Sequence, residues 1–223
     1  MTYPLVVMKN MPCHIITLLI ITPLLTGHTI LKECKKSVKR NDIEFDWVSH
    51  EGDGEAPENR QLAIDGYKDK YKVLPQYTFV LDRDIICGRH MIDRLHNKLK
   101  DTPDNIGFSY CPFEFKGHVN MKVPPIEYDI QKLIVSNYIS GVSLYKSNVL
   151  DKVNGFTTEK FLHRLNDWAM FIRLYREGYS GILCKDANFI AISSENDISS
   201  GSDEEYAMSY NHVVDNYIRG IKL

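Results

Sequence analysis

The sequence predicts an α/β fold in which a mostly parallel central sheet is flanked by helices. Strand and helix patterns alternate from the first apolar run to residue 81, as they do in βαβ units. The first run is rich in β-branched residues on both faces, which is typical of a parallel strand covered on both sides. Hydrophobic residues make up 43% and charged residues 25% of the 223 residues, which is globular composition.

The first apolar run opens the fold. Residues 13–25 read CHIITLLIITPLL and predict a buried strand with a loop at Thr22–Gly27. The same run, preceded by Lys9, leaves a signal segment as an alternative. It is too short, and too interrupted by His14 and Pro23, to be a membrane span, which needs roughly 20 apolar residues.

Helices and strands then alternate along the first half. The spacing of apolar residues predicts helices over Thr29–Lys39, Asn59–Tyr71 and Arg89–Lys100. Short apolar runs predict strands over Phe45–Ser49 and Tyr77–Leu81. Parallel sheets bind ligands outside the carboxyl ends of their strands, so we expect the loops after these strands to form a binding crevice.

The second half has a different pattern. Aromatic, proline and glycine residues through Asn105–Pro125 predict hairpin-like strands. A helix or strand that approaches a glycine turn is predicted at Tyr128–Ile139, followed by a short helix at Asn148–Val153. An amphipathic helix is predicted at Asp167–Glu177, a strand within Ile182–Ile192 and a final helix at Glu204–Ile218.

Charge and cysteine content argue against several classes of protein. A formal net charge of −2 and a pI near 6.4 are unlike a protein that grips nucleic acid through its phosphates. The cysteines occur singly with no CxxC pair, so neither a zinc knuckle nor a dithiol redox site is predicted. We expect reduced, mostly buried thiols in a cytosolic compartment, at Cys13, Cys34, Cys87, Cys111 and Cys184.

Acidic residues follow two of the predicted strands. Asp82-Arg83-Asp84 comes directly after YTFVL, and Glu51 lies in the Gly-rich loop HEGDGEAPEN. Two carboxylates at i and i+2 can share Mg²⁺ or Mn²⁺ with a phosphate ligand. Taken alone, each feature is also what a solvated acidic loop would show.

Asp167 and Gly141 each have two interpretations. Asp167 begins a predicted helix, where a carboxylate either interacts with the helix dipole or serves as a general base. Gly141 is either a tight turn or a place where the backbone approaches a ligand. The histidines form no HExxH motif, and His212 has only a weak case as a metal ligand.

The order of five segments carries more information than any one of them. They are IITLLIITPLLTG, FDWVSHEGDG, YTFVLDRDI, ISGVSLYKSNVLDKVNGF and LNDWAMFIRLYREGYSG. From about His14 to about Ala191 the chain resembles the inverting GT-A glycosyltransferases of family 2. It is also similar to small glycosyltransferase domains encoded by large algal viruses.

The resemblance implies a role for each matched residue. Asp167 would be the general base, and Asp84 with Asp82 would hold the metal. The donor nucleotide-sugar would contact Thr22, Pro23, Glu51, Arg60, Asp82 and Arg83, with Arg60 on the diphosphate side. The acceptor side would be formed by Gly141 and Trp168.

The sequence also departs from the family pattern. Leu24-Leu25 stands where a Tyr-Asn is usual, and Glu51 within HEGDG stands where the family has a double Asp. Asn166 replaces the acid that often precedes the base. The first two changes bear on nucleotide binding, and the third bears on acceptor contacts.

The resemblance implies one GT-A domain over residues 1–223. Residues 14–104 would form the nucleotide-sugar half and residues 105–192 the acceptor half, with a flexible loop and helix at 193–223. The expected protein is soluble and cytoplasmic, in the host cytosol if viral, and a monomer or weak homodimer. No transmembrane segment and no nucleic-acid partner are expected.

The implied activity is an inverting, metal-dependent transfer. A sugar would move from a nucleotide-sugar, expected to be a UDP-sugar, to a hydroxyl of a glycan or glycoprotein acceptor, with Mn²⁺ or Mg²⁺ as cofactor. Two alternatives stay open. One is a nucleotidyltransferase, although TPLLTGHT lacks the basic residues of a phosphate-binding loop. The other is a degenerate sugar-binding domain.

Overall fold

The protein is described by a computed structural model over residues 6–8, 17–159, 162, 164–195 and 202–221. Its central sheet has seven strands in the order β1-β3-β2-β4-β9-β6-β10. These strands are β1 (Val6–Met8), β3 (Phe45–Gly52), β2 (Leu18–Leu25), β4 (Tyr77–Val80), β9 (Leu144–Lys146), β6 (Ile106–Tyr110) and β10 (Ser180–Leu183). All run in one direction except β1 and β9, so the predicted mostly parallel sheet is confirmed.

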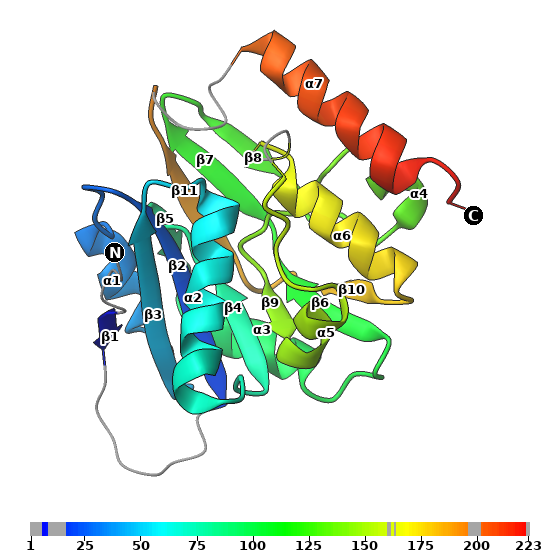
Figure 1. The fold of residues 1–223 in the computed structure, drawn as a ribbon. Helices are drawn as coiled ribbons and strands as arrows, with labels where there is room; N and C mark the ends of the chain where they lie inside the picture. The colour runs from blue at the N-terminus through cyan, green and yellow to red at the C-terminus, as the bar shows by residue number, and fades with distance from the viewer. Residues whose placement is uncertain (1–5, 9–16, 160–161, 163, 196–201, 222–223) are drawn as a thin grey trace.

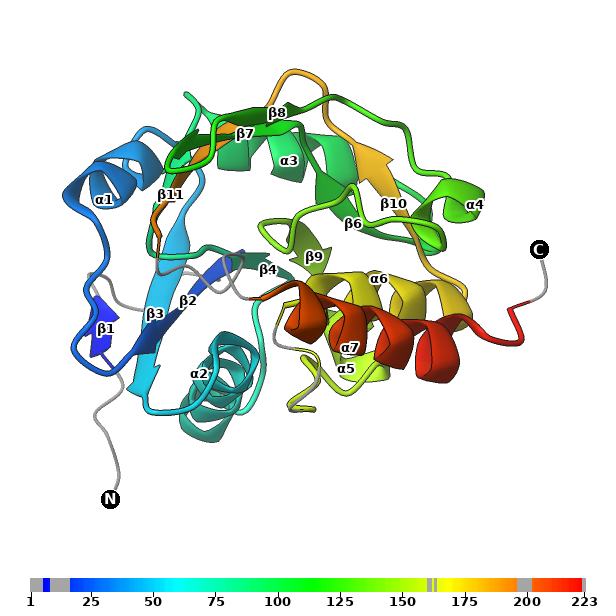
Figure 2. The ribbon, with the colours of Figure 1, turned by 90° about the horizontal axis from the view of Figure 1, so that it is seen from above.

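A second, four-stranded sheet, here called the small sheet, has the order β5-β11-β7-β8. Its strands are β5 (Ile85–Cys87), β11 (Phe189–Ser193), β7 (Phe113–Gly117) and β8 (Met121–Val123). Strands β7 and β8 form the antiparallel hairpin expected in Asn105–Pro125. The small sheet lies against one face of the central sheet, beside α3 (Met91–Leu99) (Figure 2).

Helices cover both faces of the central sheet. Helices α1 (Lys32–Val38) and α3 lie on the face that also carries the small sheet, and α2 (Ala56–Tyr71) covers the other face (Figures 1 and 2). The remaining helices are α4 (Ile130–Leu133), α5 (Ser147–Lys152), α6 (Asn166–Arg176) and α7 (Asp203–Val213), which continues as the π-helical turn η3 (Val214–Ile218). Helices α6 and α7 lie side by side.

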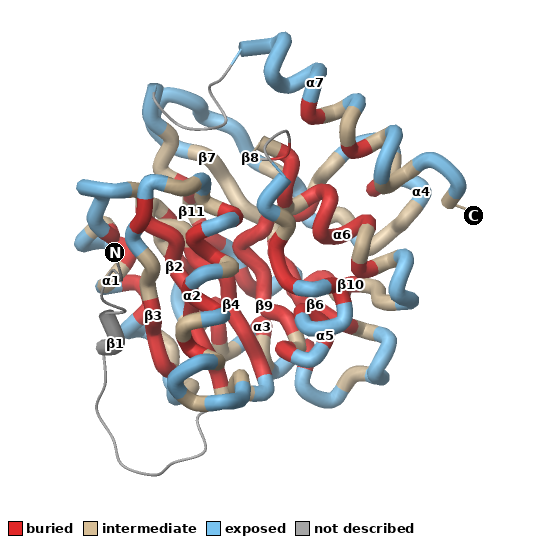
Figure 3. The backbone as a smooth tube through the Cα atoms, viewed as in Figure 1, coloured by how far each residue is buried: buried red, intermediate tan, exposed pale blue. Residues whose placement is uncertain are grey.

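Strand β2 is buried on both faces. Leu19 and Ile21 belong to the core beneath α2 and α6, whereas Leu18 and Ile20 belong to the core beneath α1 and α3. Successive residues of a strand point to opposite faces, which is why the four side chains enter two cores. All four are 0% exposed, so both faces of β2 are covered. Figure 3 shows this burial running through the central strands, with exposed residues on the outer helices and loops.

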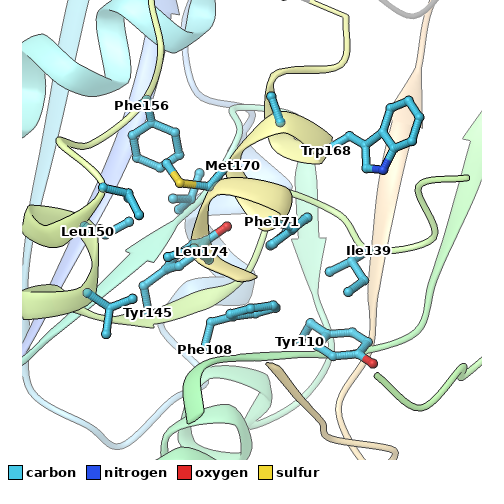
Figure 4. Close-up of a cluster of buried hydrophobic side chains, with 14 of the residues drawn as sticks. Phe108, Tyr110, Ile139, Tyr145, Leu150, Phe156, Trp168, Met170, Phe171 and Leu174 are labelled. Carbon is cyan, nitrogen blue, oxygen red and sulfur yellow. The ribbon is translucent and has the colours of Figure 1, made fainter. Parts of the chain in front are cut away.

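Aromatic rings fill the core beneath α6 (Figure 4). The ring of Phe108 stacks on Phe171 with centroids 4.9 Å apart and lies 5.9 Å from the ring of Tyr145. Gly181 on β10 makes room for this packing, because a Cβ there would come within 2.5 Å of the Phe108 ring. The aromatic cluster therefore joins β6, β9 and β10 to α6.

The expected loop at Thr22–Gly27 is wrong in its first half. Strand β2 runs through Pro23 to Leu25, paired with β3 up to Gly52. Strand β4 pairs with β2 only over Leu18–Ile21, so Pro23 lies where β2 has a single neighbour and its missing N–H is tolerated.

Other predictions meet different outcomes. The stretch Ile182–Ile192 contributes to two strands, β10 and β11, which belong to different sheets. Cys34, Cys87, Cys111 and Cys184 are buried free thiols, as expected. Residues 13–16 of the first apolar run, with Cys13 among them, and residues 196–201 of the expected flexible loop lie outside the described residues. No helix in the described part of the chain is both long enough and apolar enough to cross a membrane.

Replacing Phe108 with alanine should lower the free energy of unfolding by about 3–5 kcal/mol, because the stacked ring leaves a cavity. Chemical denaturation monitored by circular dichroism measures this loss. Val73→Ala is the matched control, since Val73 is 69% exposed and its truncation should change stability by less than about 0.5 kcal/mol. Equal stability of the two variants would contradict the packing argument.

Candidate active site

A cavity of about 370 Å³ lies where the central sheet, the small sheet, α2 and α6 converge. The structure brings most of the predicted site residues to its wall, although they come from distant parts of the chain. Those lining it are Pro23, Arg60, Asp82, Arg83, Asp84, Gly141 and Asp167. This places both expected metal ligands and the expected base around one space.

The Asp82-Arg83-Asp84 segment links the two sheets. The N–H of Leu81 continues the β4 ladder by donating to the Ile21 carbonyl, at 3.0 Å. The carbonyl of Arg83 then accepts from Leu31 at 3.0 Å, and the carbonyl of Asp84 accepts from Ile192 at 3.1 Å. The backbone of this segment is therefore held by hydrogen bonds to β2, to the residue before α1 and to β11, so its side chains project from a fixed backbone.

Arg60 forms an ion pair with Asp82 on the wall of the cavity. Its Nη2 lies 2.6 Å from Asp82 Oδ1, and the side chains are 10% and 34% exposed respectively. The guanidinium also lies over the Phe156 ring, 5.8 Å from the centroid. Burial by itself would lower the pKa of Arg60, but Asp82 reverses this and raises it. Arg60 is therefore a permanent cation.

Asp167 lies in the first turn of α6 and is half-buried. Its Oδ1 accepts from the Trp168 N–H at 2.8 Å, and its Oδ2 accepts from the Gly141 N–H at 3.2 Å. Burial raises the pKa of Asp167 above its ordinary value, while Arg60 and these two N–H groups oppose the shift. A carboxylate with a raised pKa is a better proton acceptor, which suits a general base.

Gly141 lies so close to Asp167 that a side chain at position 141 would make a tight contact. A Cβ at position 141 would lie 3.2 Å from the Asp167 Cβ. The carbonyl of Gly141 also accepts a hydrogen bond from the buried Tyr145 hydroxyl at 3.3 Å. The Gly141 backbone therefore lies against the side chain of Asp167, and its approach to a ligand stays a prediction.

Three predicted residues do not line the cavity. Thr22 is buried, and its Oγ1 accepts from Trp47 Nε1 at 3.0 Å. Trp168 is 1% exposed, and its Nε1 donates to the Leu133 carbonyl at 2.6 Å. Glu51 lies nearby in β3, where its side chain accepts from the Gly27 N–H at 2.8 Å and joins the ends of β2 and β3.

Asn59 is a structural residue that the sequence reasoning missed. It is fully buried, and its Nδ2 donates to the carbonyls of Leu24 at 2.9 Å and Gly54 at 3.0 Å. It thereby holds the ends of β2 and β3 together beside the cavity. In the sequence, the structural role of Asn59 is indicated only by a polar residue next to Arg60 on a predicted helix. Many solvated helices show the same pattern.

Other residues on the cavity wall had no predicted role. They come from the loop after β2, from the small sheet and from the segment before α6: His28, Phe113, Phe115, Ile192, Ser193 and Arg164. The side that includes β7 is therefore aromatic. The side that includes β4, α2 and α6 carries the acidic residues and Arg60.

The cavity has donor atoms that fit a divalent cation. Asp82 and Asp84 offer hard carboxylate oxygens on the same wall, as Mg²⁺ or Mn²⁺ prefers, and a diphosphate would supply further oxygens. In the described part of the chain, the one cluster of three close metal-ligating side chains is elsewhere, at Asp42, His90 and Asp93. There the Asp93 carboxylate accepts the N–H groups of Asp42 and Ile43, which explains it as a loop contact.

His212 is not a member of the cavity wall. Its Nε2 contacts the Glu159 carboxylate, which also accepts the Tyr217 hydroxyl. These contacts hold the last turns of the chain against the segment before α6. The weak case for His212 as a ligand of the metal therefore gains no support from its position.

Comparisons with known proteins give different results for sequence and for structure. No protein-family model matches the sequence, and no curated protein matches it. S. aureus TarS residues 1–349 in complex with UDP-GlcNAc superposes with a TM-score of 0.62 at 10% identity, covering 92% of this chain and 68% of that one. The complex of the same protein with UDP gives 0.56 at 10% identity, covering 89% and 66%.

A third similar structure is a mannosyltransferase. The mannosyltransferase PcManGT from Pyrobaculum calidifontis, in complex with GDP-Man and Mn²⁺, gives a TM-score of 0.50 at 12% identity, covering 81% of this chain and 58% of that one. This chain therefore spans about two thirds or less of the length of these neighbours. The predicted fold class is confirmed, because the chain shares the GT-A fold of these glycosyltransferases.

Proposed function

We propose that this protein is an inverting, metal-dependent glycosyltransferase of the family 2 type, similar to the small enzymes of large algal viruses. It transfers a sugar from a nucleotide-sugar, a UDP-sugar, to a hydroxyl of a glycan acceptor. One observation carries the proposal: Asp82 and Asp84, after β4, line the same cavity as Asp167, in α6. The nucleotide-sugar ligands named for the neighbouring structures support a donor of this class.

The donor side is assigned to the end of β4. Asp84, with Asp82, would hold Mn²⁺ or Mg²⁺, which when bound offsets the negative charge on the departing diphosphate. Glu51 and Pro23 lie at the joined ends of β2 and β3 and would contact the nucleoside. Arg83 lines the cavity beside the two aspartates and would contact the diphosphate.

The acceptor side is assigned to Asp167. Its carboxylate takes the proton of the acceptor hydroxyl as the acceptor oxygen forms a bond to the anomeric carbon. The bond from that carbon to the diphosphate breaks, and the nucleoside diphosphate leaves with the electron pair. Attack from the opposite face inverts the anomeric centre, and a positioned base typically contributes ~10²–10⁴-fold to such a step.

A thermal-shift panel of UDP-, GDP- and dTDP-sugars, with and without Mn²⁺, tests donor binding. We expect the melting temperature to rise with a UDP-sugar only when Mn²⁺ is present, because a ligand that binds the native state stabilises it. Asp84→Asn should abolish the metal-dependent rise, and Asp215→Asn on the surface should keep it. The absence of any response to nucleotide-sugars would contradict the proposed function.

Asp167→Asn should reduce sugar transfer by about 10²-fold or more, because an amide cannot take the acceptor proton. Release of the nucleoside diphosphate measures turnover, and the thermal shift with donor and Mn²⁺ should persist. In the wild type, turnover should fall on the acid side of a pKa raised above the ordinary Asp value, since only the ionised carboxylate is a base. Full activity of Asp167→Asn would remove the base assignment, while donor binding without turnover in the wild type would favour a sugar-binding domain.

Gly141→Ala should lower kcat roughly tenfold with little change in donor affinity. The new methyl group would lie 3.2 Å from the Cβ of Asp167 and would press on that side chain, and small displacements of a catalytic group are costly. Steady-state kinetics separates the two effects, and thermal melting checks that the variant folds. A loss of donor affinity at unchanged kcat would instead place Gly141 on the donor side.

A further inference from the structure

Arg60 is better suited to hold protein side chains than to bind the donor. Its side chain is only 10% exposed, and its Nε is buried without a hydrogen-bond partner among the described residues. One edge of the guanidinium is committed to Asp82 through the 2.6 Å contact, and the Phe156 ring lies over it at 5.8 Å. A direct contact with a diphosphate would have to compete with these interactions.

The surroundings of Arg60 include Asp167. Both residues line the same cavity, and each contributes to the electrostatic environment of the other. Arg60 approaches from α2, Asp82 from the end of β4 and Asp167 from the first turn of α6. One buried cation therefore pairs with Asp82 and lies on the wall of the cavity that Asp167 also lines.

The other charged and titratable groups around Asp167 do not duplicate this cation. Asp82 opposes ionisation of Asp167, and Tyr145 on β9 is a buried neutral phenol whose pKa is raised by burial. The N–H groups of Gly141 and Trp168 are dipoles. Asp84, Arg83 and Arg164 also line the cavity, but they are not among the main influences on the pKa of Asp167.

We infer that Arg60 is a positioning residue for the transfer reaction, which pairs with the donor-side carboxylate Asp82 and supplies a buried positive charge to the cavity that the general base Asp167 also lines. It keeps the base ionised in a site from which water is partly excluded, and it fixes Asp82 in place by its ion pair. This role replaces the direct diphosphate contact expected from the sequence. The inference depends on the proposed function, because it assigns Arg60 a task in that reaction.

The charge of Arg60 can be separated from its hydrogen bond by two substitutions. Arg60→Lys keeps the cation, whereas Arg60→Gln keeps a hydrogen-bond donor for Asp82 but removes the charge. Arg219→Gln is the matched control, since Arg219 forms an exposed ion pair with Asp215 on the surface. Circular dichroism and thermal melting establish which variants fold.

The readout is the pH dependence of nucleoside diphosphate release from a UDP-sugar with Mn²⁺. In Arg60→Gln the acid limb should move about one unit or more to higher pH, because an opposite charge nearby favours the ionised carboxylate. In Arg60→Lys and Arg219→Gln the limb should stay near the wild-type position. An Arg60→Gln variant that is slower at every pH, with the limb unmoved, would overturn the inference and leave a merely structural role.

A direct titration covers variants with too little turnover. NMR of ¹³C-labelled aspartate carboxyls, with Asp167→Asn for assignment, should show the Asp167 midpoint displaced upward in folded Arg60→Gln, or in Arg60→Met if the former does not fold. An undisplaced midpoint would overturn the inference. If the wild type turns over no nucleotide-sugar, the proposed function fails, while this titration still reports on the electrostatic effect of Arg60 on Asp167.

Discussion

The burial of strand β2 on both faces is the constraint on which the rest of the structure depends. Its side chains enter two separate cores, so both sides of the sheet must be covered, and its neighbours β3 and β4 run parallel to it. Parallel strands end at a common edge. The segments that leave β2, β3 and β4 therefore meet there, and the Asp82-Arg83-Asp84 segment lies among them.

That shared edge creates an electrostatic problem. Asp82 and Asp167 are partly buried around one cavity, and burial of charge is unfavourable unless it is compensated. Arg60 offsets the cost for Asp82 through their ion pair, and the N–H of Gly141 donates a hydrogen bond to Asp167. The same groups that stabilise these ionised side chains thus shape a site that can hold a cation and accept a proton.

Most of the long elements follow from local sequence patterns, whereas the short ones do not. Strands β5 and β9 have three residues each, which is too few to show a periodic pattern of apolar residues. They form because β5 pairs with β11, and because β9 pairs with β4 and β6. Trp168 was expected beside the acceptor. A helix turns about 100° per residue, so the neighbour of a cavity-facing Asp167 points elsewhere, in this protein into the core.

The sequence by itself determined the alternation of strands and helices, the edge at which acidic residues gather, and the order of segments typical of a GT-A fold. Only the tertiary structure decided that Arg60 pairs with Asp82 and that the Gly141 backbone contacts Asp167. It also decided that the hydroxyl of Thr22 accepts a hydrogen bond from Trp47. These contacts join residues far apart along the chain. The periodicity of apolar residues indicates which face of a helix or strand a residue occupies. The distance between side chains on two different elements is set by packing, which a local sequence pattern does not encode.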